Sequence, residues 1–320
     1  MGTPTDGMQV LLASPRGFCA GVDRAIEIVE RALALYGPPV YVLHEIVHNR
    51  HVLEDFRGRG VRFVESMDEI PPGSVTIFSA HGVAEEVETR GKERGLRVID
   101  ATCPLVTKVH LQAQRYEKER REIVLVGHPG HPEVEGTQGR IEGRVHVLST
   151  VEEVERLVVA NPEHLAYVTQ TTLSVDDTRD VIEALKRRFP SIKGPELADI
   201  CYATQNRQNA VKELSDRIDL LLVVGSPNSS NSNRLRELGE RRGIVSHLID
   251  SEHDLVPAWF RPGLRIGVTA GASAPEALVR KVLARLAELG VSAVTEMEGE
   301  PESVVFQLPP ELRAGEVTRA

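Results

Sequence analysis

Cysteine is scarce in this chain, and the scarcity limits its chemistry. The 320 residues contain three cysteines, an odd number that intrachain disulfide bonds would leave with one unpaired. A sparse, odd set in a long chain is typical of thiol chemistry or metal binding in a reducing compartment. The sequence also lacks an apolar run of membrane-spanning length, and its short polar start lacks the basic residues of a signal peptide. We therefore expect a cytoplasmic protein with no membrane partner.

Basic residues are also fewer than acidic residues. There are 38 Lys and Arg residues against 47 Asp and Glu residues, which gives a formal net charge of −9, and the basic residues are scattered among acidic ones. Nucleic-acid-binding surfaces concentrate Lys and Arg instead, so we expect no nucleic-acid partner. The Walker and G-x-G-x-x-G sequences that bind nucleotides are also absent.

What the chain does contain is a threefold repeat, marked by its cysteines. Cys19, Cys103 and Cys201 each open one unit, and a polar residue at the end of an expected strand follows 29, 28 and 28 positions later. A second polar residue closes each unit. The six polar tips are, in chain order, His48 and His81, then His131 and Thr171, then Ser229 and Ser273. Three such units around a pseudo-threefold axis can bring three thiols and six polar tips together.

Within each unit the apolar pattern predicts alternating helices and strands. Helices are expected over 22–35, 105–119, 181–189 and 205–215, and strands over 40–43, 61–64, 75–78, 123–126, 145–148, 165–168, 220–224 and 266–268. Asp176 and Asp177 are expected to cap the helix 181–189, and 304–308 is expected to add a strand. Because short links join strands and helices, we predict an α/β fold of three pseudo-symmetric lobes with small parallel sheets. The lobes are expected over 8–100, 101–198 and 199–290, with a tail over 291–320.

All three cysteines stand at the start of an expected helix. Cys19 lies in a glycine-flanked turn, and Cys103 precedes Pro104, a residue type favoured at the first helical position. A helix N-terminus favours the thiolate, which is the form that binds metal. Cysteine zinc sites usually use C-x-x-C pairs, and ferredoxin-type clusters use four cysteines. Three separated cysteines suit a 4Fe–4S cluster whose fourth iron is open to substrate or water.

A competing motif lies at 44–48, where His-Glu-Ile-Val-His matches the H-E-x-x-H pattern of zinc proteases. That motif requires a helix, which puts both histidines on one face. Here it directly follows an expected strand, so a tip at His48 is favoured over a protease site.

The tips predict an anion site. In open parallel sheets ligands bind beyond the carboxyl ends of the strands, where all six tips are expected. Three imidazoles, with hydroxyls and an amide from Ser229, Asn231 and Ser273, suit a phosphate or diphosphate. Glu133 lies two residues after His131. It is either an acid that stabilises a helix start or a proton donor, and the sequence leaves the two readings open.

Eight segments carry a resemblance to a known family. They are PRGFCAGV (15–22), HEIVHN (44–49), FSAHG (78–82), DATCPLV (100–106), GHPEVEG (130–136), TQTTLS (169–174), NSSNSN (228–233) and TAGAS (269–273). Over about residues 8–290 the chain resembles the 4-hydroxy-3-methylbut-2-enyl diphosphate reductases, the last enzymes of the non-mevalonate isoprenoid route. Pro227 stands where that family commonly has Lys, which leaves the matched polar residues in place.

The resemblance implies an oxidoreductase that removes the allylic hydroxyl of its substrate as water, giving isopentenyl and dimethylallyl diphosphates. It implies a central 4Fe–4S cluster, one per chain, held by Cys19, Cys103 and Cys201, and we expect the substrate hydroxyl to bind the open iron. Glu133 would relay protons, and Thr171 would contact the hydroxyl region. The diphosphate is assigned to His48, His81, His131, Ser229, Ser230, Asn231 and Ser273. A ferredoxin or flavodoxin is implied as the electron donor.

Two rival functions remain beside the zinc protease. An iron–sulfur dehydratase would use the same open iron without net redox change, and would therefore need no reductant. A non-catalytic iron–sulfur sensor would need a regulated partner surface, and it would leave the six polar tips without a role.

Overall fold

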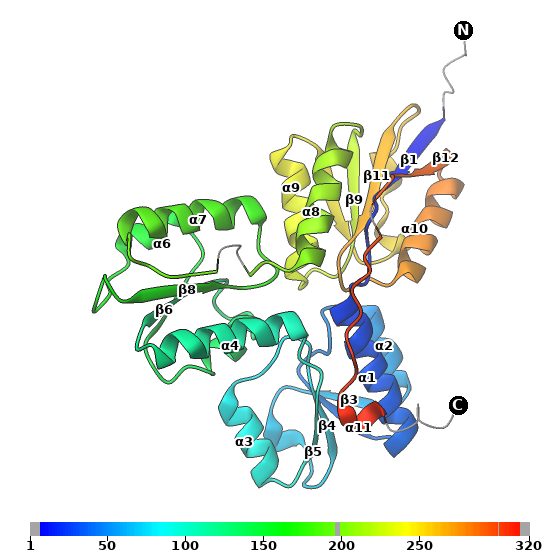
Figure 1. The fold of residues 1–320 in the computed structure, drawn as a ribbon. Coiled ribbons are helices and arrows are strands. Elements are labelled where there is room, and N and C mark those ends of the chain that lie inside the picture. The colour runs from blue at the N-terminus through cyan, green and yellow to red at the C-terminus, as the bar shows by residue number, and fades with distance from the viewer. Residues whose placement is uncertain (1–6, 196–198, 300, 314–320) are drawn as a thin grey trace. The chain divides into compact units, whose positions relative to one another are not determined.

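The computed structural model describes residues 7–195, 199–299 and 301–313. Helices and strands alternate along the chain, and the strands form three parallel sheets (Figure 1). The described residues divide into two compact units. Unit 1 comprises those within 1–19, 48–52 and 202–304, and unit 2 those within 20–47, 53–201 and 305–320. The predicted α/β class with small parallel sheets is confirmed, whereas the boundaries of the three lobes stay a prediction.

Two of the sheets lie in unit 2. The first has the order β3-β2-β4-β5, with β2 over Val40–Leu43, β3 over Val61–Val64, β4 over Val75–Phe78 and β5 over Arg97–Asp100. The second has the order β7-β6-β8, with β6 over Glu122–Val126, β7 over Val145–Leu148 and β8 over Leu165–Thr169. A parallel bridge between Ala166 and Lys193 extends the second sheet beyond β8.

The third sheet lies in unit 1 and has the order β10-β9-β11-β1-β12. Its strands are β1 over Met8–Leu12, β9 over Leu220–Val224, β10 over Val245–Ile249, β11 over Arg265–Ala270 and β12 over Val291–Glu296. All its strand pairs are parallel, with Val224 opposite both Ile249 and Ala270.

All three sheets share one strand order. The first strand of each repeat is central, the second lies on one side of it, and the third lies on the other: β3-β2-β4, β7-β6-β8 and β10-β9-β11. The chain therefore reverses direction across the sheet between the first and third strands. Ligands of open parallel sheets bind at such a switch point, beyond the carboxyl ends of the strands. The six polar tips follow these two strands in each repeat.

The strand that leads to each cysteine belongs to the sheet of the preceding repeat. β5 pairs with β4 before Cys103, and Lys193 bridges to β8 before Cys201. β1 pairs with β11 before Cys19, although we predicted that residue 8 begins the first lobe. The lobe boundary at residue 8 rested on position in the chain, whereas the pairing of β1 depends on residues more than 250 positions away.

Helices connect the strands. They are α1 (Ala20–Tyr36), α2 (Arg50–Gly58), α3 (Glu85–Glu93), α4 (Pro104–Lys118), α5 (Pro132–Gln138), α6 (Val151–Arg156), α7 (Val175–Arg188), α8 (Tyr202–Ser215), α9 (Ser230–Arg241), α10 (Glu276–Glu288) and α11 (Pro310–Arg313). Within the parts of the chain that the structure describes, none of these helices is long and apolar enough to cross a membrane.

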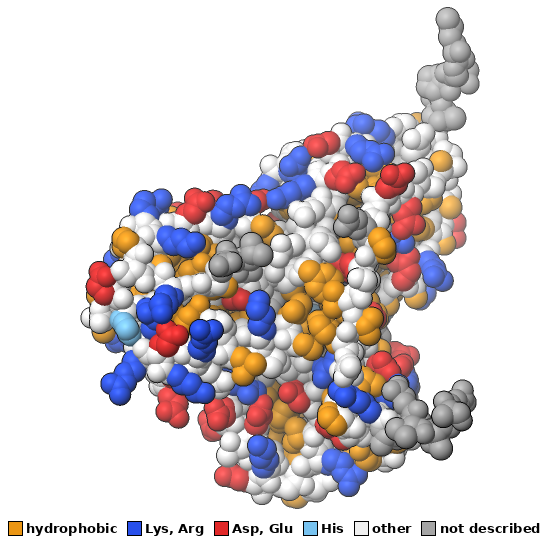
Figure 2. Space-filling model, viewed as in Figure 1, with side chains coloured by type: hydrophobic (Ala, Val, Ile, Leu, Met, Phe, Trp, Pro, Cys, Tyr) orange, Lys and Arg blue, Asp and Glu red, His pale blue; other side chains and the backbone are white. Residues whose placement is uncertain are grey.

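Both faces of the sheet around β6 are covered by helices, as Figure 1 shows for α4 and α7. Val124 and Val126 pack with Val181 and Leu185 of α7 on one face. Ile123 and Leu125 pack with residues of α4 on the other face. A strand buried on both faces needs a continuous apolar run, which is the pattern that predicted these strands. Charged side chains remain on the outer surface (Figure 2).

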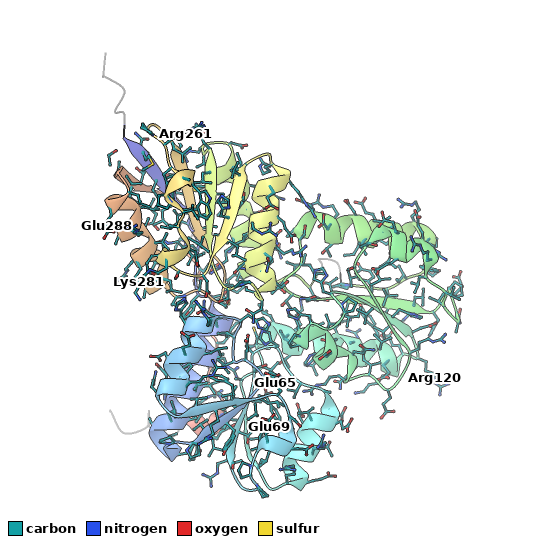
Figure 3. All side chains as sticks on the ribbon, turned by 180° about the vertical axis from the view of Figure 1, so that it is seen from behind. Glu65, Glu69, Arg120, Arg261, Lys281 and Glu288 are labelled. Carbon is teal, nitrogen blue, oxygen red and sulfur yellow. The ribbon has the colours of Figure 1, made fainter. Side chains whose placement is uncertain are left out.

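The acidic turn of each repeat is a capping box. Ser66, Thr150 and Ser251 each accept a hydrogen bond from a backbone N–H at the start of the next short helix. An acid three positions later, Glu69, Glu153 or Asp254, accepts a hydrogen bond from the backbone of the capping residue. Figure 3 labels Glu69 and its neighbour Glu65 in the first of these turns. The same two bonds close the turn in all three repeats, which supports the internal repetition.

Two predictions about smaller elements are wrong. Residues 304–308 form no strand, and the last strand among the described residues is β12 at the edge of the third sheet. Ser174, and not Asp176 or Asp177, caps α7, because its side chain accepts a hydrogen bond from the backbone N–H of Asp177. The two aspartates lie in the first helical turn, where negative charge is favourable.

Candidate functional site

The three cysteines occupy the same structural position in each repeat. Cys19 directly precedes α1, Cys201 directly precedes α8, and Cys103 is the N-cap residue of α4. All three are half-buried, and none is in a disulfide bond. The N–H groups of a first helical turn favour the thiolate, which is the form of cysteine that binds metals.

Backbone hydrogen bonds tie the cysteine loops to the second tips. In unit 2 the N–H of Cys103 donates to the carbonyl of Ala80, beside His81, at 3.0 Å, and the N–H of Cys201 donates to the carbonyl of Thr171 at 3.1 Å. In unit 1 the N–H of Gly17 donates to the carbonyl of Ala270 at 3.1 Å. Each cysteine loop is therefore fixed to the carboxyl end of a sheet.

Arg207 holds the loop that carries Cys19. Its guanidinium, fully buried, donates to the carbonyl of Gly17 at 2.7 and 3.0 Å and to that of Phe18 at 3.1 Å. It also pairs with Glu302 at 3.0 and 3.2 Å. Because the planar fork of Arg satisfies carbonyls and a carboxylate together, this contact fixes the loop that leads to Cys19.

The tips of unit 1 converge at the start of α9. Ser229 caps this helix by accepting from the N–H of Ser232 at 3.3 Å. The Ser273 hydroxyl donates to the carbonyl of His48 at 2.8 Å and lies 3.4 Å from the Ser229 hydroxyl. A Cβ at Gly271 would lie 2.0 Å from the Ser232 hydroxyl, so only glycine allows this approach.

Asn231, in the first turn of α9, has a buried side-chain amide whose oxygen and nitrogen find no hydrogen-bond partner within the described residues. A buried polar group without a partner is unfavourable, and native proteins rarely keep one without a role. The amide sits where a helix N-terminus favours an anion. It is therefore available to a ligand bound beside Ser229 and Ser230.

His81 and His131 lie together in unit 2. Their ring centroids are 6.0 Å apart and their planes are nearly perpendicular. His131 caps α5, and its Nδ1 accepts from the backbone N–H of Glu133 at 3.1 Å. Since Nδ1 is the acceptor, the neutral ring carries its proton on Nε2. That N–H can donate to an anion.

Glu133, two residues after His131, is buried. Its Oε1 accepts from the backbone N–H of Thr171 at 2.7 Å, and its Oε2 accepts from the Thr171 hydroxyl at 2.9 Å. Burial raises the pKa of Glu133 to about 7, although the two bonds from Thr171 oppose this shift. A carboxyl group with a pKa near neutrality suits proton donation.

Three buried polar residues near the tips were missed by the sequence analysis. Asp199 accepts from the N–H of Thr169 at 3.3 Å, and burial raises its pKa. Gln170 joins the two tips of the second repeat, since it accepts from the N–H of His128 at 3.0 Å and donates to the Thr172 hydroxyl at 3.0 Å. Arg207, described above, is the third. Gln170 directly follows β8, Asp199 lies two residues before Cys201, and Arg207 lies on the helix that follows Cys201, and this placement was the available signal.

The zinc-protease pattern has no helix to support it. Residues 44–48 lie in a loop, and His44 has a φ of 61°, which is outside the helical range. His44 contacts Glu65 at 3.2 Å. The two histidines of the pattern therefore cannot share one helix face.

The chain was compared with known proteins. A model of the LytB protein family matches residues 10–287. The chain belongs to the LytB family. It is similar to the 4-hydroxy-3-methylbut-2-enyl diphosphate reductase of Stenotrophomonas maltophilia strain K279a, with 60% identity over 311 residues that cover 96% of this chain and 98% of the relative. The enzyme of the same name from Xylella fastidiosa strain M12 is 59% identical over the same shares.

Among solved structures, the E-1-hydroxy-2-methyl-but-2-enyl-4-diphosphate reductase of Plasmodium falciparum has a TM-score of 0.91 at 37% identity. The match covers 96% of this chain and 97% of that one. The resemblance to the 4-hydroxy-3-methylbut-2-enyl diphosphate reductases that the sequence motifs carry, and the fold that it implied, are thereby confirmed.

Proposed function

We propose that this chain is a 4-hydroxy-3-methylbut-2-enyl diphosphate reductase. The reaction adds two electrons and two protons to the allylic alcohol, breaks its carbon–oxygen bond, and releases water with isopentenyl or dimethylallyl diphosphate. The observation that carries the proposal is the repeated placement of three disulfide-free cysteines at helix starts. The names of relatives that match nearly the whole chain support the substrate.

The donor set fits an iron–sulfur cluster. Cys19, Cys103 and Cys201 would hold it, since half-buried thiols at helix starts form thiolates readily and three of them leave one iron open. When bound, the cluster would supply electrons one at a time and a Lewis-acidic iron for the substrate hydroxyl.

The diphosphate would be bound by the polar tips. The N-terminus of α9 offers backbone N–H groups, with the hydroxyls of Ser229 and Ser230 and the amide of Asn231. His48, His81, His131 and Ser273 would add further hydrogen bonds. The unpartnered amide of Asn231 supports this assignment, because a phosphate oxygen and a hydroxyl would satisfy it.

Glu133 would provide the proton for the leaving hydroxyl group. Its buried carboxyl is protonated at neutral pH more often than an exposed one, because burial raises its pKa to about 7. The Thr171 hydroxyl donates to Oε2 and so fixes the orientation of the carboxyl group. Thr171 would thus orient Glu133 and border the substrate hydroxyl. Protonated oxygen leaves as water, which lowers the barrier to breaking the carbon–oxygen bond.

The electrons would come from a ferredoxin or flavodoxin, since the reaction needs two electrons for each turnover. The test is an anaerobic assay of the purified protein with 4-hydroxy-3-methylbut-2-enyl diphosphate, with and without reduced methyl viologen. We expect both diphosphate products only when reductant is present. Substrate consumption without reductant would favour an iron–sulfur dehydratase, and no consumption under either condition would contradict the proposal.

A further inference from the structure

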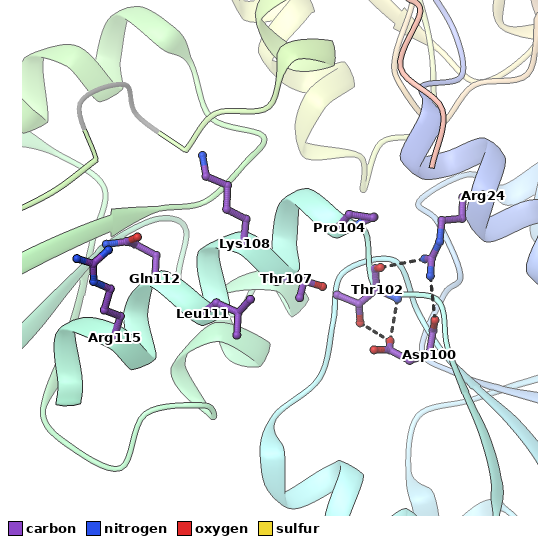
Figure 4. A pocket seen from close by; sticks show the side chains of 9 residues that line it. All are labelled: Arg24, Asp100, Thr102, Pro104, Thr107, Lys108, Leu111, Gln112 and Arg115. Atoms are coloured by element: carbon purple, nitrogen blue, oxygen red, sulfur yellow. Dashed lines mark hydrogen bonds between the residues drawn. The ribbon is translucent and has the colours of Figure 1, made fainter. Parts of the chain in front are cut away.

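A groove on unit 2 runs along α4 beside Cys103. It has a volume of about 530 Å³, and Arg24 of α1 and the first three turns of α4 line it (Figure 4). Its walls include Pro104, Lys108, Leu111 and Arg115. We propose that this groove is the docking surface for a small, acidic electron-carrier protein. The inference rests on the proposed reductase function, because that function requires electrons from outside the chain.

The groove begins at a proposed cluster ligand. Pro104, in its wall, is bonded directly to Cys103. Thr107, also in the wall, donates its N–H to the carbonyl of Cys103 at 2.9 Å and its hydroxyl to the same carbonyl at 3.4 Å. A carrier seated in the groove would therefore have a short covalent and hydrogen-bonded path to the Cys103 backbone.

The groove is positive although the chain as a whole is negative. Three cations, Arg24, Lys108 and Arg115, line it against one carboxylate, Asp100. The Asp100 carboxylate already accepts from the N–H and the hydroxyl of Thr102, at 2.8 and 2.5 Å. Figure 2 shows Lys and Arg side chains over α4, with Asp and Glu side chains beside them. A local positive surface on a protein of net charge −9 selects acidic partners and speeds their encounter.

One of the three cations is half-buried and held in place, and the other two are exposed. Arg24 donates to the carbonyls of Ala101 and Thr102 at 3.2 and 3.0 Å and to that of Gln307 at 2.8 Å. The Lys108 and Arg115 side chains are 68% and 74% exposed, with their paired acids 3.9 and 3.7 Å away. At that exposure such pairs contribute little, so both charges can act on a partner.

An apolar residue lies between the two exposed cations. Leu111 is 61% exposed, and positions 108, 111 and 115 share one face of α4. An exposed leucine bordered by cations is the composition of a small transient interface, in which an apolar contact is surrounded by steering charges. The occupant that fits is an acidic one-electron carrier with an apolar rim around its own cofactor.

The test compares two double variants with equal charge change. Leu111→Glu with Arg115→Glu alters the groove, and Ala277→Glu with Lys281→Glu makes the same change on α10 of unit 1, where both residues are exposed. Lys108 is left unchanged because it lies near Asp199. The oxidation of a reduced acidic plant-type 2Fe–2S ferredoxin by each protein is followed by stopped flow at several ionic strengths. Turnover with reduced methyl viologen is measured alongside.

We expect the groove variant to lose at least about tenfold in the second-order rate with ferredoxin, and to lose most of its salt dependence. The α10 variant should retain at least about half of that rate, and both should keep wild-type turnover with methyl viologen. Equal rates for the two variants with ferredoxin would overturn the docking proposal while leaving the reductase intact. If the groove variant also fails with methyl viologen, the single variant Arg115→Gln is tested in its place. A wild-type rate with ferredoxin in that variant would overturn the proposal. Failure of the wild-type protein with both donors would instead contradict the proposed function.

Discussion

Thr171 binds both carboxylate oxygens of Glu133, one through its backbone N–H and one through its hydroxyl, at 2.7 and 2.9 Å. The two residues come from different elements, since Glu133 lies in α5 and Thr171 follows β8. This contact joins the first and second tips of the second repeat. Burial of the carboxyl raises the pKa of Glu133 to about 7, although the two bonds from Thr171 oppose this rise.

Replacing Glu133 tests its role in proton transfer. Glu133→Gln keeps the shape of the side chain and removes the proton, so we expect cluster content and substrate binding to remain while turnover falls about 10²- to 10⁴-fold. Turnover is measured with reduced methyl viologen. Glu135→Gln, at an exposed position of the same helix, should keep the wild-type rate. Wild-type turnover in Glu133→Gln would remove Glu133 from the reaction.

The raised pKa of Glu133 also predicts how stability depends on pH. The folded state binds this proton more tightly than the unfolded state, whose Glu has a pKa of about 4.5. The contribution is complete below about pH 4.5 and is lost as pH rises through about 7. Urea unfolding of the cluster-free protein at pH 5 and pH 8 should therefore show a larger loss of stability in the wild type than in Glu133→Gln. An equal loss of stability between pH 5 and pH 8 in both proteins would contradict the raised pKa of the buried Glu133 carboxyl.

Because the amide of Asn231 has no hydrogen-bond partner within the described residues, we expect its replacement to weaken ligand binding without lowering stability. Asn231→Leu has nearly the same shape and removes only unsatisfied polar atoms, so the ligand-free protein should be at least as stable as the wild type. Stabilisation by added inorganic diphosphate, measured as a rise in Tm, should shrink or vanish.

Asn233 offers the matched comparison. Its amide donates to the carbonyls of Pro227 and Ser229 at 2.7 and 2.9 Å, so Asn233→Leu should cost about 1–3 kcal/mol of stability. If Asn231→Leu lost as much stability as Asn233→Leu, the amide of Asn231 would have a hydrogen-bond partner within the protein and would not be available to a ligand.

The Arg207–Glu302 pair predicts a defect specific to the Cys19 loop. Arg207→Met removes the donor to the carbonyls of Gly17 and Phe18 and leaves the mostly buried Glu302 carboxylate with the Asn206 amide but no cation, so we expect a loss of about 3–5 kcal/mol in unfolding free energy. Glu302→Gln, which retains hydrogen-bonding atoms, should lose less, and Arg217→Met at an exposed position should change stability by less than about 0.5 kcal/mol. Iron content per chain is measured in parallel. Arg207→Met with wild-type stability and iron would show that the loop does not depend on this contact.

Much of the fold could be predicted because its strands are short apolar runs, and central strands such as β2 and β9 are buried along their whole length. The strands over 40–43, 61–64, 75–78, 145–148 and 220–224 match the structure residue for residue. β12 was missed because it is an exposed edge strand paired only with β1, and its side chains carry little apolar signal. The expected strand at 304–308 contains Val305, which is 86% exposed, so a run of apolar letters there does not correspond to burial.

The residues of the candidate site also divide into those whose placement the sequence predicts and those whose placement it does not. The placement of His131 and Ser229 beyond the carboxyl ends of strands could be predicted, because apolar runs mark where the strands end. Arg207 and Asp199 could not, since their roles depend on partners from distant segments, and a charged residue in a helix or loop is exposed in most proteins. The cap at Ser174 was missed because a nearby pair of aspartates offered an equally good signal.

The central claim is that three cysteines hold a cluster with one open iron. It is tested most directly by Mössbauer and electron paramagnetic resonance spectra of anaerobically purified protein, recorded with and without 4-hydroxy-3-methylbut-2-enyl diphosphate. We predict a 4Fe–4S cluster with one distinct iron, whose signal changes when substrate is added. Zinc, or no metal at all, in protein kept free of oxygen would contradict the claim.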